Sequence, residues 1–214
     1  MEHSNKYIFI YAIIMVVVVA VSLSVVAVQL KPAQEDNIRI EKMQNILTSV
    51  NVPIAEVPKK EVIEVYHKYI TSAVGINING DVVETNADKV FAVDLANELK
   101  KKPEQQILPV FFASLDNGDT AYVVPLRGKG LWGPVWGYIS FKTDFNTVLG
   151  TMFDHKGETP GLGAEINQAW FMDPFKGKTI YDKDGKFTSI QIVKGGAPDD
   201  DPHGVDAISG GTIT

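Results

Sequence analysis

Uncharged apolar residues fill one long run near the start of the chain. The run extends from Tyr7 to Leu30, and Lys6 and Lys31 bracket it. A bilayer core about 30 Å thick needs about 20 apolar residues in a helix, and this run exceeds that length. A cleaved signal peptide is the alternative, but its apolar region spans only about 7–15 residues before a cleavage site of small residues. The pattern therefore favours an uncleaved transmembrane helix over residues 7–30, after a short flank at 1–6.

Two segments beyond this run carry apolar residues at the three- and four-residue steps of an amphipathic helix. The first, from Ile38 to Val50, predicts a stalk helix that leads away from the bilayer. Pro53 and Pro58 then break the pattern, and residues 61–72 resume it. For both helices, ordinary packing against a core is the favoured interpretation. Residues 31–60 are accordingly interpreted as a juxtamembrane helix and linker.

The rest of the chain favours strands joined by turns. Residues 110–115 and 120–126 flank the turn signal Asp-Asn-Gly-Asp, which predicts a hairpin. Further strands are expected at 138–142, 148–153 and 187–193, and a short helix at 164–171. Helices first, then a run of antiparallel strands, indicate one α+β domain over residues 61–214 rather than a parallel βαβ sheet.

Composition and charge narrow the functional classes. The 214 residues are 45% apolar and 21% charged, which suits a single folded core. The net charge of −6 has the wrong sign for a surface that neutralises phosphates, so nucleic acid is not an expected partner. The absence of cysteine excludes thiol nucleophiles, thiolate-bound metal clusters and disulfides. Basic residues flank the span on both sides, so charge leaves its orientation open.

A glycine-rich segment, Gly128 to Gly133, matches the spacing G-x-G-x-x-G after a strand. A dinucleotide-binding motif must open a helix, but here Pro134 and another strand follow, so a hairpin loop is favoured. In the functional alternative, Trp132 lies against a flat ligand and Lys129 sits near its phosphate or its ring.

Three further segments allow a structural and a chemical interpretation. Residues 157–163 combine Pro160 with three glycines, so either a ligand approaches the backbone or the chain turns tightly with Thr159 as a helix N-cap. The acidic residues at 199–201 are interpreted as a solvated loop, and no metal site is expected. Residues 206–214 carry small hydroxyl residues around two glycines, which fits a phosphate-binding nest, although a Ser/Gly-rich tail without a ligand is the favoured interpretation.

Several segments, taken together and in order along nearly the whole chain, are far more specific than any one of them. They are Leu30-Lys31-Pro32, Asn45-Ile46-Leu47, Gly128-Lys129-Gly130-Leu131-Trp132, Gly157-Glu158-Thr159-Pro160-Gly161-Leu162-Gly163, Lys194-Gly195-Gly196-Ala197 and His203-Gly204-Val205-Asp206. With this set of motifs, the chain resembles the C-subunit family of the sodium-translocating NADH:quinone oxidoreductase. The last segment, Asp206 to Thr212, resembles the flavinylation signature of that family.

The resemblance implies a cofactor and its binding residues. Thr212 would carry FMN through a phosphoester bond, with Thr214 as the rival acceptor, and the family usually has alanine where this chain has Gly211. No catalytic residue is implied. The residues that the resemblance assigns to the flavin site are Asp206, Ser209, Gly210 and Gly211 beside the acceptor, and Thr159, Leu162, Gly163, Trp132 and Lys129 near the isoalloxazine.

The resemblance also implies a function. It predicts a membrane-anchored flavoprotein subunit that carries electrons through covalent FMN, while the whole complex couples NADH oxidation and quinone reduction to sodium export. Its partners would be the other subunits and a flavin transferase. The protein would cross the bacterial cytoplasmic membrane once, with an FMN-binding domain at residues 61–214 on the outer, periplasmic side. Two alternatives are the G subunit of the related ferredoxin:NAD complex and a cofactor-free, membrane-tethered scaffold.

Overall fold

The computed structural model describes residues 5–208 and divides the chain into two units, Met1–Lys42 and Met43–Thr214. Helix α1, Asn5–Ser49, begins in the first unit and ends in the second, and Pro32 lies inside it. The predicted span and the predicted stalk are therefore one continuous helix. Among the described residues, α1 is the one helix long and apolar enough to cross a membrane, and its apolar side chains from Tyr7 to Leu30 are exposed.

The end of α1 is part of the core of the second unit. Met43, Ile46 and Leu47 are almost completely buried. Two hydrogen bonds tie this end to the sheet. Ser140 Oγ on strand β5 (Pro134–Phe141) donates to the Ser49 carbonyl oxygen (2.5 Å), and Asn51 Nδ2 donates to the Leu149 carbonyl oxygen (2.9 Å). Core packing of the stalk is thus confirmed from Met43 to Val50, whereas Ile38, at the start of the predicted stripe, is 65% exposed.

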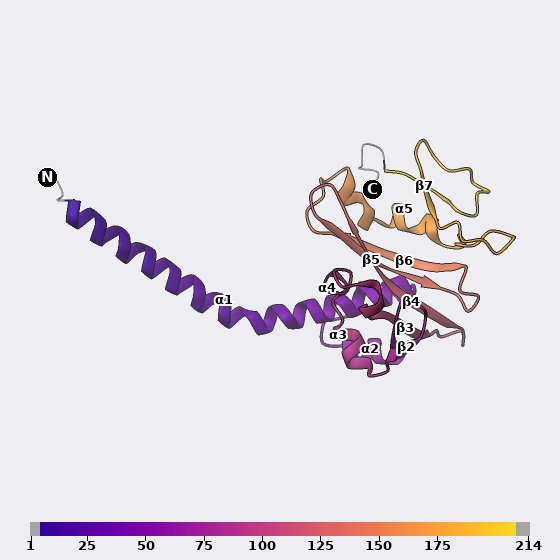
Figure 1. The fold of residues 1–214 in the computed structure, drawn as a ribbon, viewed down its shortest axis with the longest axis horizontal. Helices are drawn as coiled ribbons and strands as arrows, with labels where there is room; N and C mark the ends of the chain where they lie inside the picture. The colour runs from indigo at the N-terminus through magenta and orange to yellow at the C-terminus, as the bar shows by residue number, and fades with distance from the viewer. Residues whose placement is uncertain (1–4, 209–214) are drawn as a thin grey trace. The chain divides into compact units, whose positions relative to one another are not determined.

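The second unit is built on one antiparallel sheet with the strand order β2-β1-β3-β4-β5-β6 (Figure 1). Strands β3 to β6 follow one another as hairpins, so neighbours in sequence are neighbours in space. This arrangement confirms the predicted α+β class with an antiparallel sheet. The six strands are β1 Ile70–Ile76, β2 Val82–Glu84, β3 Leu108–Ser114, β4 Thr120–Lys129, β5 Pro134–Phe141 and β6 Val148–His155.

Helices cover one face of the sheet. Helix α2, Val62–Tyr69, and helix α3, Ala87–Ala92, pack on β1, and α4, Leu95–Glu98, contacts β4. Phe91 of α3 lies edge-on between Tyr66 of α2 and Phe111 of β3. Alternate residues of β3 and β4 face this layer and are buried, as expected for strands with a side-chain period of two.

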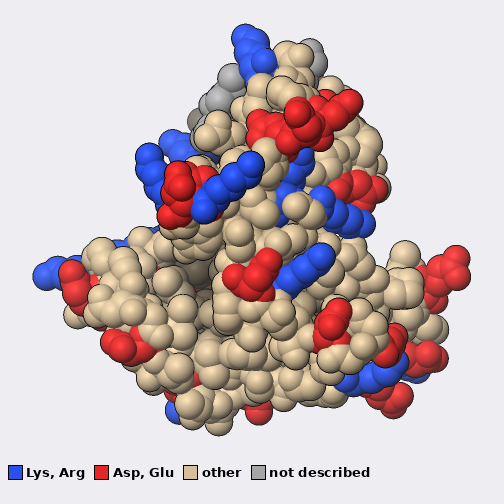
Figure 2. Space-filling view, turned by 90° about the vertical axis from the view of Figure 1, so that its right-hand side faces the viewer, with Lys and Arg blue, Asp and Glu red and all other residues tan. Residues whose placement is uncertain are grey.

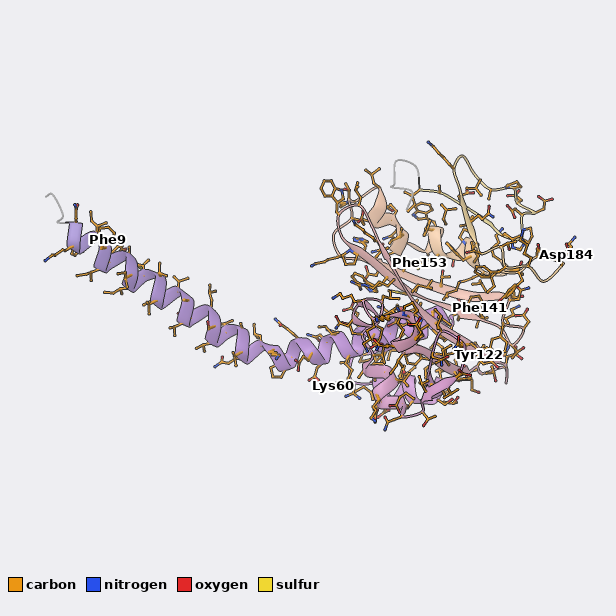
Figure 3. The ribbon with its side chains drawn as sticks, in the orientation of Figure 1. Phe9, Lys60, Tyr122, Phe141, Phe153 and Asp184 are labelled. Carbon is orange, nitrogen blue, oxygen red and sulfur yellow. The ribbon has the colours of Figure 1, made fainter. Side chains whose placement is uncertain are left out.

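The chain after β6 covers the other face at the β5–β6 edge. It contains the 3-10 turns η2 (Gly163–Asn167) and η3 (Asp173–Phe175), helix α5 (Ala169–Met172), and strands β7 (Gln191–Val193) and β8 (Gly204–Asp206), which pair in parallel. Phe141 and Phe153, labelled in Figure 3, come from β5 and β6 and pack with Phe175 and Val205 into one apolar cluster. The C-terminal segments are thereby held against the sheet.

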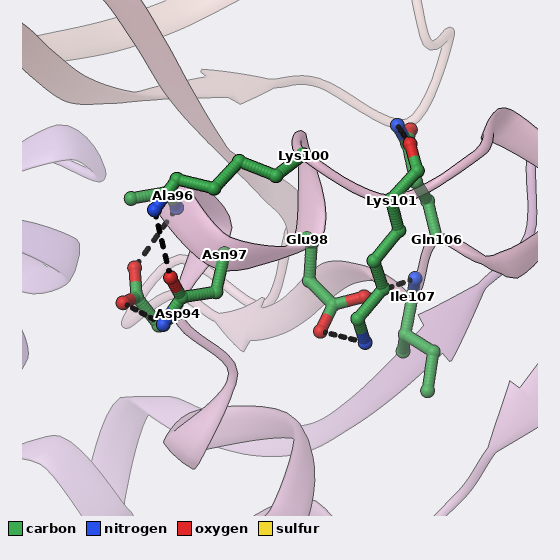
Figure 4. Close-up of polar contacts among 8 residues, drawn as sticks. All are labelled: Asp94, Ala96, Asn97, Glu98, Lys100, Lys101, Gln106 and Ile107. Carbon is green, nitrogen blue, oxygen red and sulfur yellow. Dashed lines mark hydrogen bonds and ion pairs between the residues drawn. The ribbon is translucent and has the colours of Figure 1, made fainter.

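A buried acid secures the crossing from α4 to β3. Glu98 is 8% exposed and accepts hydrogen bonds from Lys101 Nζ (2.6 Å) and the Ile107 N–H (2.9 Å), as Figure 4 shows. Burial raises the pKa of Glu98, but these two hydrogen bonds outweigh it, so the pKa lies below its ordinary value. Asp94 caps the start of α4 by accepting from the Ala96 N–H.

Three predicted elements differ in extent. The helix predicted at 61–72 ends at Tyr69, because the following residues pair with β3 as strand β1. The strand predicted at 187–193 is confined to Gln191–Val193, and the helix predicted at 164–171 is divided between η2 and α5. Pairing with another strand sets the boundary in the first two cases. The predicted domain limits at residues 31 and 61 stay predictions.

Candidate functional site

The tip of the β4–β5 hairpin is a short glycine-bounded loop. Lys129 pairs with Pro134 at the last register position, and the Gly130 N–H donates to the Gly133 carbonyl oxygen (2.7 Å). Leu131 and Trp132 lie between the two glycines, and Trp132 is 69% exposed. The predicted hairpin loop is confirmed, and no helix follows it that would receive a dinucleotide.

A second loop follows β6 and turns tightly at Pro160. The Leu162 N–H donates to the Thr159 carbonyl oxygen (3.1 Å), and Gly161 has φ +75°, as position i+2 of a type II turn requires. The tight turn, one of the two interpretations that the sequence left open, is present. Thr159 is not a helix N-cap, because the positive φ of Gly161 interrupts any helix and η2 begins only at Gly163.

Glu158 connects the two loops. Its Oε1 accepts a hydrogen bond from the Trp132 N–H at 2.9 Å, although the two residues are 26 positions apart. A Cβ atom at Gly130 would collide with the same oxygen, and one at Gly163 would lie 2.8 Å from Glu158 Oε2. A side chain at either glycine would therefore have to displace this carboxylate, and residue Glu158 as a whole is only 8% exposed.

The backbone of Glu158 is held as well. Its N–H donates to His155 Nδ1 (3.1 Å), so this ring nitrogen acts as an acceptor at the end of β6. Sequence reasoning included Glu158 in the motif at 157–163 but gave it no role. The available sequence signal for Glu158 was the pair of glycines at 130 and 163, but only the folded structure shows that both lie against its carboxylate.

The two loops present apolar side chains beside this carboxylate. Leu131 and Trp132 at the hairpin tip and Leu162 in the turn are all exposed, and Glu158 lies between the segments that carry them. Added atoms at Gly161 would meet nothing within 4 Å, so the outside of the turn is open. An exposed indole with apolar neighbours suits a flat, largely apolar ring. Lys129 is the last residue of β4, pairs with Pro134 at the base of the hairpin loop, and is exposed.

Asp206 lies at the end of β8 and stabilises a different turn. Its Oδ1 accepts from the Ala197 N–H (2.7 Å), directly after Gly195 and Gly196, which both have positive φ. This bond fixes the strand that leads toward the end of the chain. The remaining predicted residues at this end, Ser209, Gly210, Gly211, Thr212 and Thr214, lie outside the described residues.

The acidic segment near residue 200 forms a hydrogen-bonded loop. Asp201 Oδ1 accepts from the His203 N–H (2.8 Å), and backbone hydrogen bonds of this kind hold the pKa of Asp201 below its ordinary value. His203 Nδ1 lies 2.6 Å from the Thr179 carbonyl oxygen. Within residues 5–208, no group of three or more His, Asp or Glu side chains is arranged to hold a metal ion.

On the face shown in Figure 2, basic and acidic side chains alternate in small groups separated by uncharged surface. Neither sign dominates this view. An extended basic surface of the kind that attracts nucleic-acid backbones is not seen there.

Known proteins resemble the chain in sequence and in fold. The FMN-binding domain family matches residues 130–214, which include both loops and Asp206. The C subunit of the Na(+)-translocating NADH-quinone reductase of Vibrio vulnificus is 32% identical over 210 residues, 92% of this chain and 81% of that protein. The corresponding protein of Pseudomonas aeruginosa is 29% identical across all of this chain and 88% of its own length.

Two crystal structures share the fold. The C subunit of the same reductase from Parabacteroides distasonis has a TM-score of 0.75 and 42% identity over 86% of both chains. NqrC from Shewanella oneidensis has a TM-score of 0.68 and 30% identity over 82% of this chain and 86% of that one. Agreement of sequence and fold over this much of each chain leads to one conclusion: the protein belongs to the C-subunit family of the Na(+)-translocating NADH-quinone reductase.

Proposed function

We propose that this protein is the membrane-anchored flavoprotein subunit that carries electrons in a sodium-translocating NADH:quinone reductase. The observation that carries the proposal is the similarity to the C subunit of Vibrio vulnificus over 92% of the chain and 81% of the relative. The FMN-binding family match at residues 130–214 supports the cofactor. As one subunit, the protein depends on other subunits to oxidise NADH, reduce quinone and export sodium.

We place the flavin attachment at Thr212, through a phosphoester between its hydroxyl and the FMN phosphate. The residue lies within the part of the chain matched by the FMN-binding family. Ser209, Gly210 and Gly211 are small, so a flavin transferase and its flavin can approach the hydroxyl, and freed backbone N–H groups can bind the phosphate. Asp206 anchors the strand that leads into this segment by holding the Ala197 N–H.

We place the ring of the flavin at the two loops joined by Glu158. We assign Trp132, Leu162, Thr159 and Gly163 to the walls of its site and Lys129 to its edge. Bound FMN supplies reversible electron transfer, and the protein contributes position and electrostatics. The exposed indole and the leucine offer an apolar surface, while the Pro160 turn keeps the backbone close and open to a ligand.

Anchoring follows from α1, whose residues 7–30 are long and apolar enough to span a bilayer once. We propose that the domain at residues 61–214 lies on the outer, periplasmic side of the bacterial cytoplasmic membrane. Covalent attachment suits that side, because FMN lost from an external domain is not replaced from the cytosolic pool.

The attachment is tested by producing the chain with and without a flavin transferase and measuring its intact mass. We expect a gain of one FMN less one water, with yellow fluorescence in the C-terminal tryptic peptide. Thr212→Ala removes the gain, whereas the matched variant Thr214→Ala, two residues further on, keeps it.

Two results would contradict the proposal. Loss of the flavin in Thr214→Ala but not in Thr212→Ala would move the acceptor to Thr214. An unmodified mass in the presence of an active transferase would refute covalent FMN and favour the scaffold function.

A further inference from the structure

The described residues contain two buried acids, and their surroundings differ. Glu98 forms an ion pair with Lys101 (2.6 Å). Glu158 is equally buried, yet none of the ion pairs among residues 5–208 includes it. Its Oε1 has a single protein donor there, the Trp132 N–H. The carboxylate therefore brings to this position a negative charge that no ion pair among residues 5–208 offsets.

The position of Glu158 relates it to the proposed flavin site. The residues on either side of its carboxylate are Gly130, which follows Lys129 and lies two residues before Trp132, and Gly163, which follows Leu162. A side chain at either glycine would have to displace the carboxylate from its present position. The negative charge is therefore built into the junction of the two loops.

We propose that Glu158 is a positioning residue of the flavin site, which fixes the Trp132 loop against the Pro160 turn and lowers the reduction potential of the flavin by its charge. This inference rests on the proposed function. Reduction adds an electron to bound FMN, and a fixed negative charge in a partly water-excluded site disfavours the added charge. A residue that only braces the loops would leave the potential unchanged when its charge alone is removed.

The test compares the midpoint potentials of the FMN-loaded full chain and its variants by spectroelectrochemical titration. Glu158→Gln keeps the size and an oxygen acceptor for the Trp132 N–H but removes the charge. We expect its potential to shift to a more positive value. The matched control is Glu165→Gln, because Glu165 also accepts one backbone N–H from this turn, that of Gly161 (2.9 Å), but is less buried. Its shift should be several times smaller.

A second measurement needs no flavin. In protein made without the transferase, Glu158→Ala should speed hydrogen exchange of the Trp132 amide, whereas Glu158→Gln should retain its protection. Gly163→Ala crowds the same carboxylate without altering its charge, because its Cβ would lie 2.8 Å from Glu158 Oε2 and meets only Glu158 atoms at close range. It should speed exchange at Trp132 likewise, and it serves if Glu158→Ala does not fold.

The possible results distinguish failure of this inference from failure of the proposed flavoprotein function. FMN-loaded Glu158→Gln with the wild-type potential, or with the same shift as Glu165→Gln, overturns the electrostatic role. Unchanged exchange of the Trp132 amide in Glu158→Ala and Gly163→Ala overturns the positioning role. A wild-type chain that takes up no FMN refutes the proposed function itself, and the exchange result is independent of that failure.

Discussion

Leu47 offers a sharp test of how α1 enters the second unit. Its side chain has no exposed surface, although it belongs to the same helix as the exposed apolar residues of the span. If the end of α1 is part of the core, truncation of Leu47 must destabilise the whole unit. If α1 were only a tether, the substitution would have little effect.

The expected magnitude follows from the burial. Replacing a fully buried leucine by alanine removes its apolar contacts and leaves a cavity, which costs about 2–5 kcal/mol, with about 3 kcal/mol as a central value. With a urea dependence of about 2 kcal/mol/M, this loss moves the unfolding midpoint down by about 1.5 M. For a unit of this size it lowers the melting temperature by about 6–12 °C.

The assay is urea unfolding of the full chain in detergent, followed by tryptophan fluorescence. The three tryptophans, Trp132, Trp136 and Trp170, all lie in the second unit, so the signal reports that unit. The control is Ile38→Ala on the same helix, because Ile38 is 65% exposed and its truncation should change stability by about 0.5 kcal/mol or less. Equal midpoints for Leu47→Ala and Ile38→Ala would refute the core role of the helix end.

Two further predictions concern buried polar groups. Ser140→Ala removes the hydroxyl that donates to the Ser49 carbonyl oxygen and should lower the free energy of unfolding by about 1–3 kcal/mol. The control Ser72→Ala, at an exposed position of β1, should be nearly neutral. Similar melting temperatures for the two variants would count against the hydrogen bond between β5 and the end of α1. The pKa of Glu98 is lowered in the folded state, so its contribution to stability is present above its unfolded pKa of about 4.3 and is lost as the pH falls through the folded value. Glu98→Gln, which removes the ion pair with Lys101, should therefore flatten the acid side of the stability curve, and parallel curves for variant and wild type would contradict that assignment.

Local patterns predicted the elements whose partners are close in sequence. The span at residues 7–30 needs only length and hydropathy, because the bilayer selects for both. The hairpin of β3 and β4 needs only two apolar runs and the turn between them. Sequence motifs also predicted the residues of the cofactor site, but those at 209–212 lie outside the described residues.

Folding decided the features that depend on distant partners. Strand β1 continues the helical stripe of α2 in sequence, and only pairing with β3 makes it extended. Strand β8 is only three residues long and is extended because it pairs with β7, from which a loop separates it. Such short segments carry too little periodicity of their own to specify a conformation.

Glu158 is the clearest case of a role set by tertiary structure. By composition it is one of 26 acidic residues and would be expected in water. The sequence alone supplies glycines at 130 and 163, where a side chain would have to displace the Glu158 carboxylate. Only the fold brought those glycines to the same carboxylate, because a hydrogen bond across 26 residues requires the hairpin and the turn to meet. Local sequence preferences therefore specify the hairpin and the turn, whereas the contact between them, made only on folding, places a carboxylate at their junction.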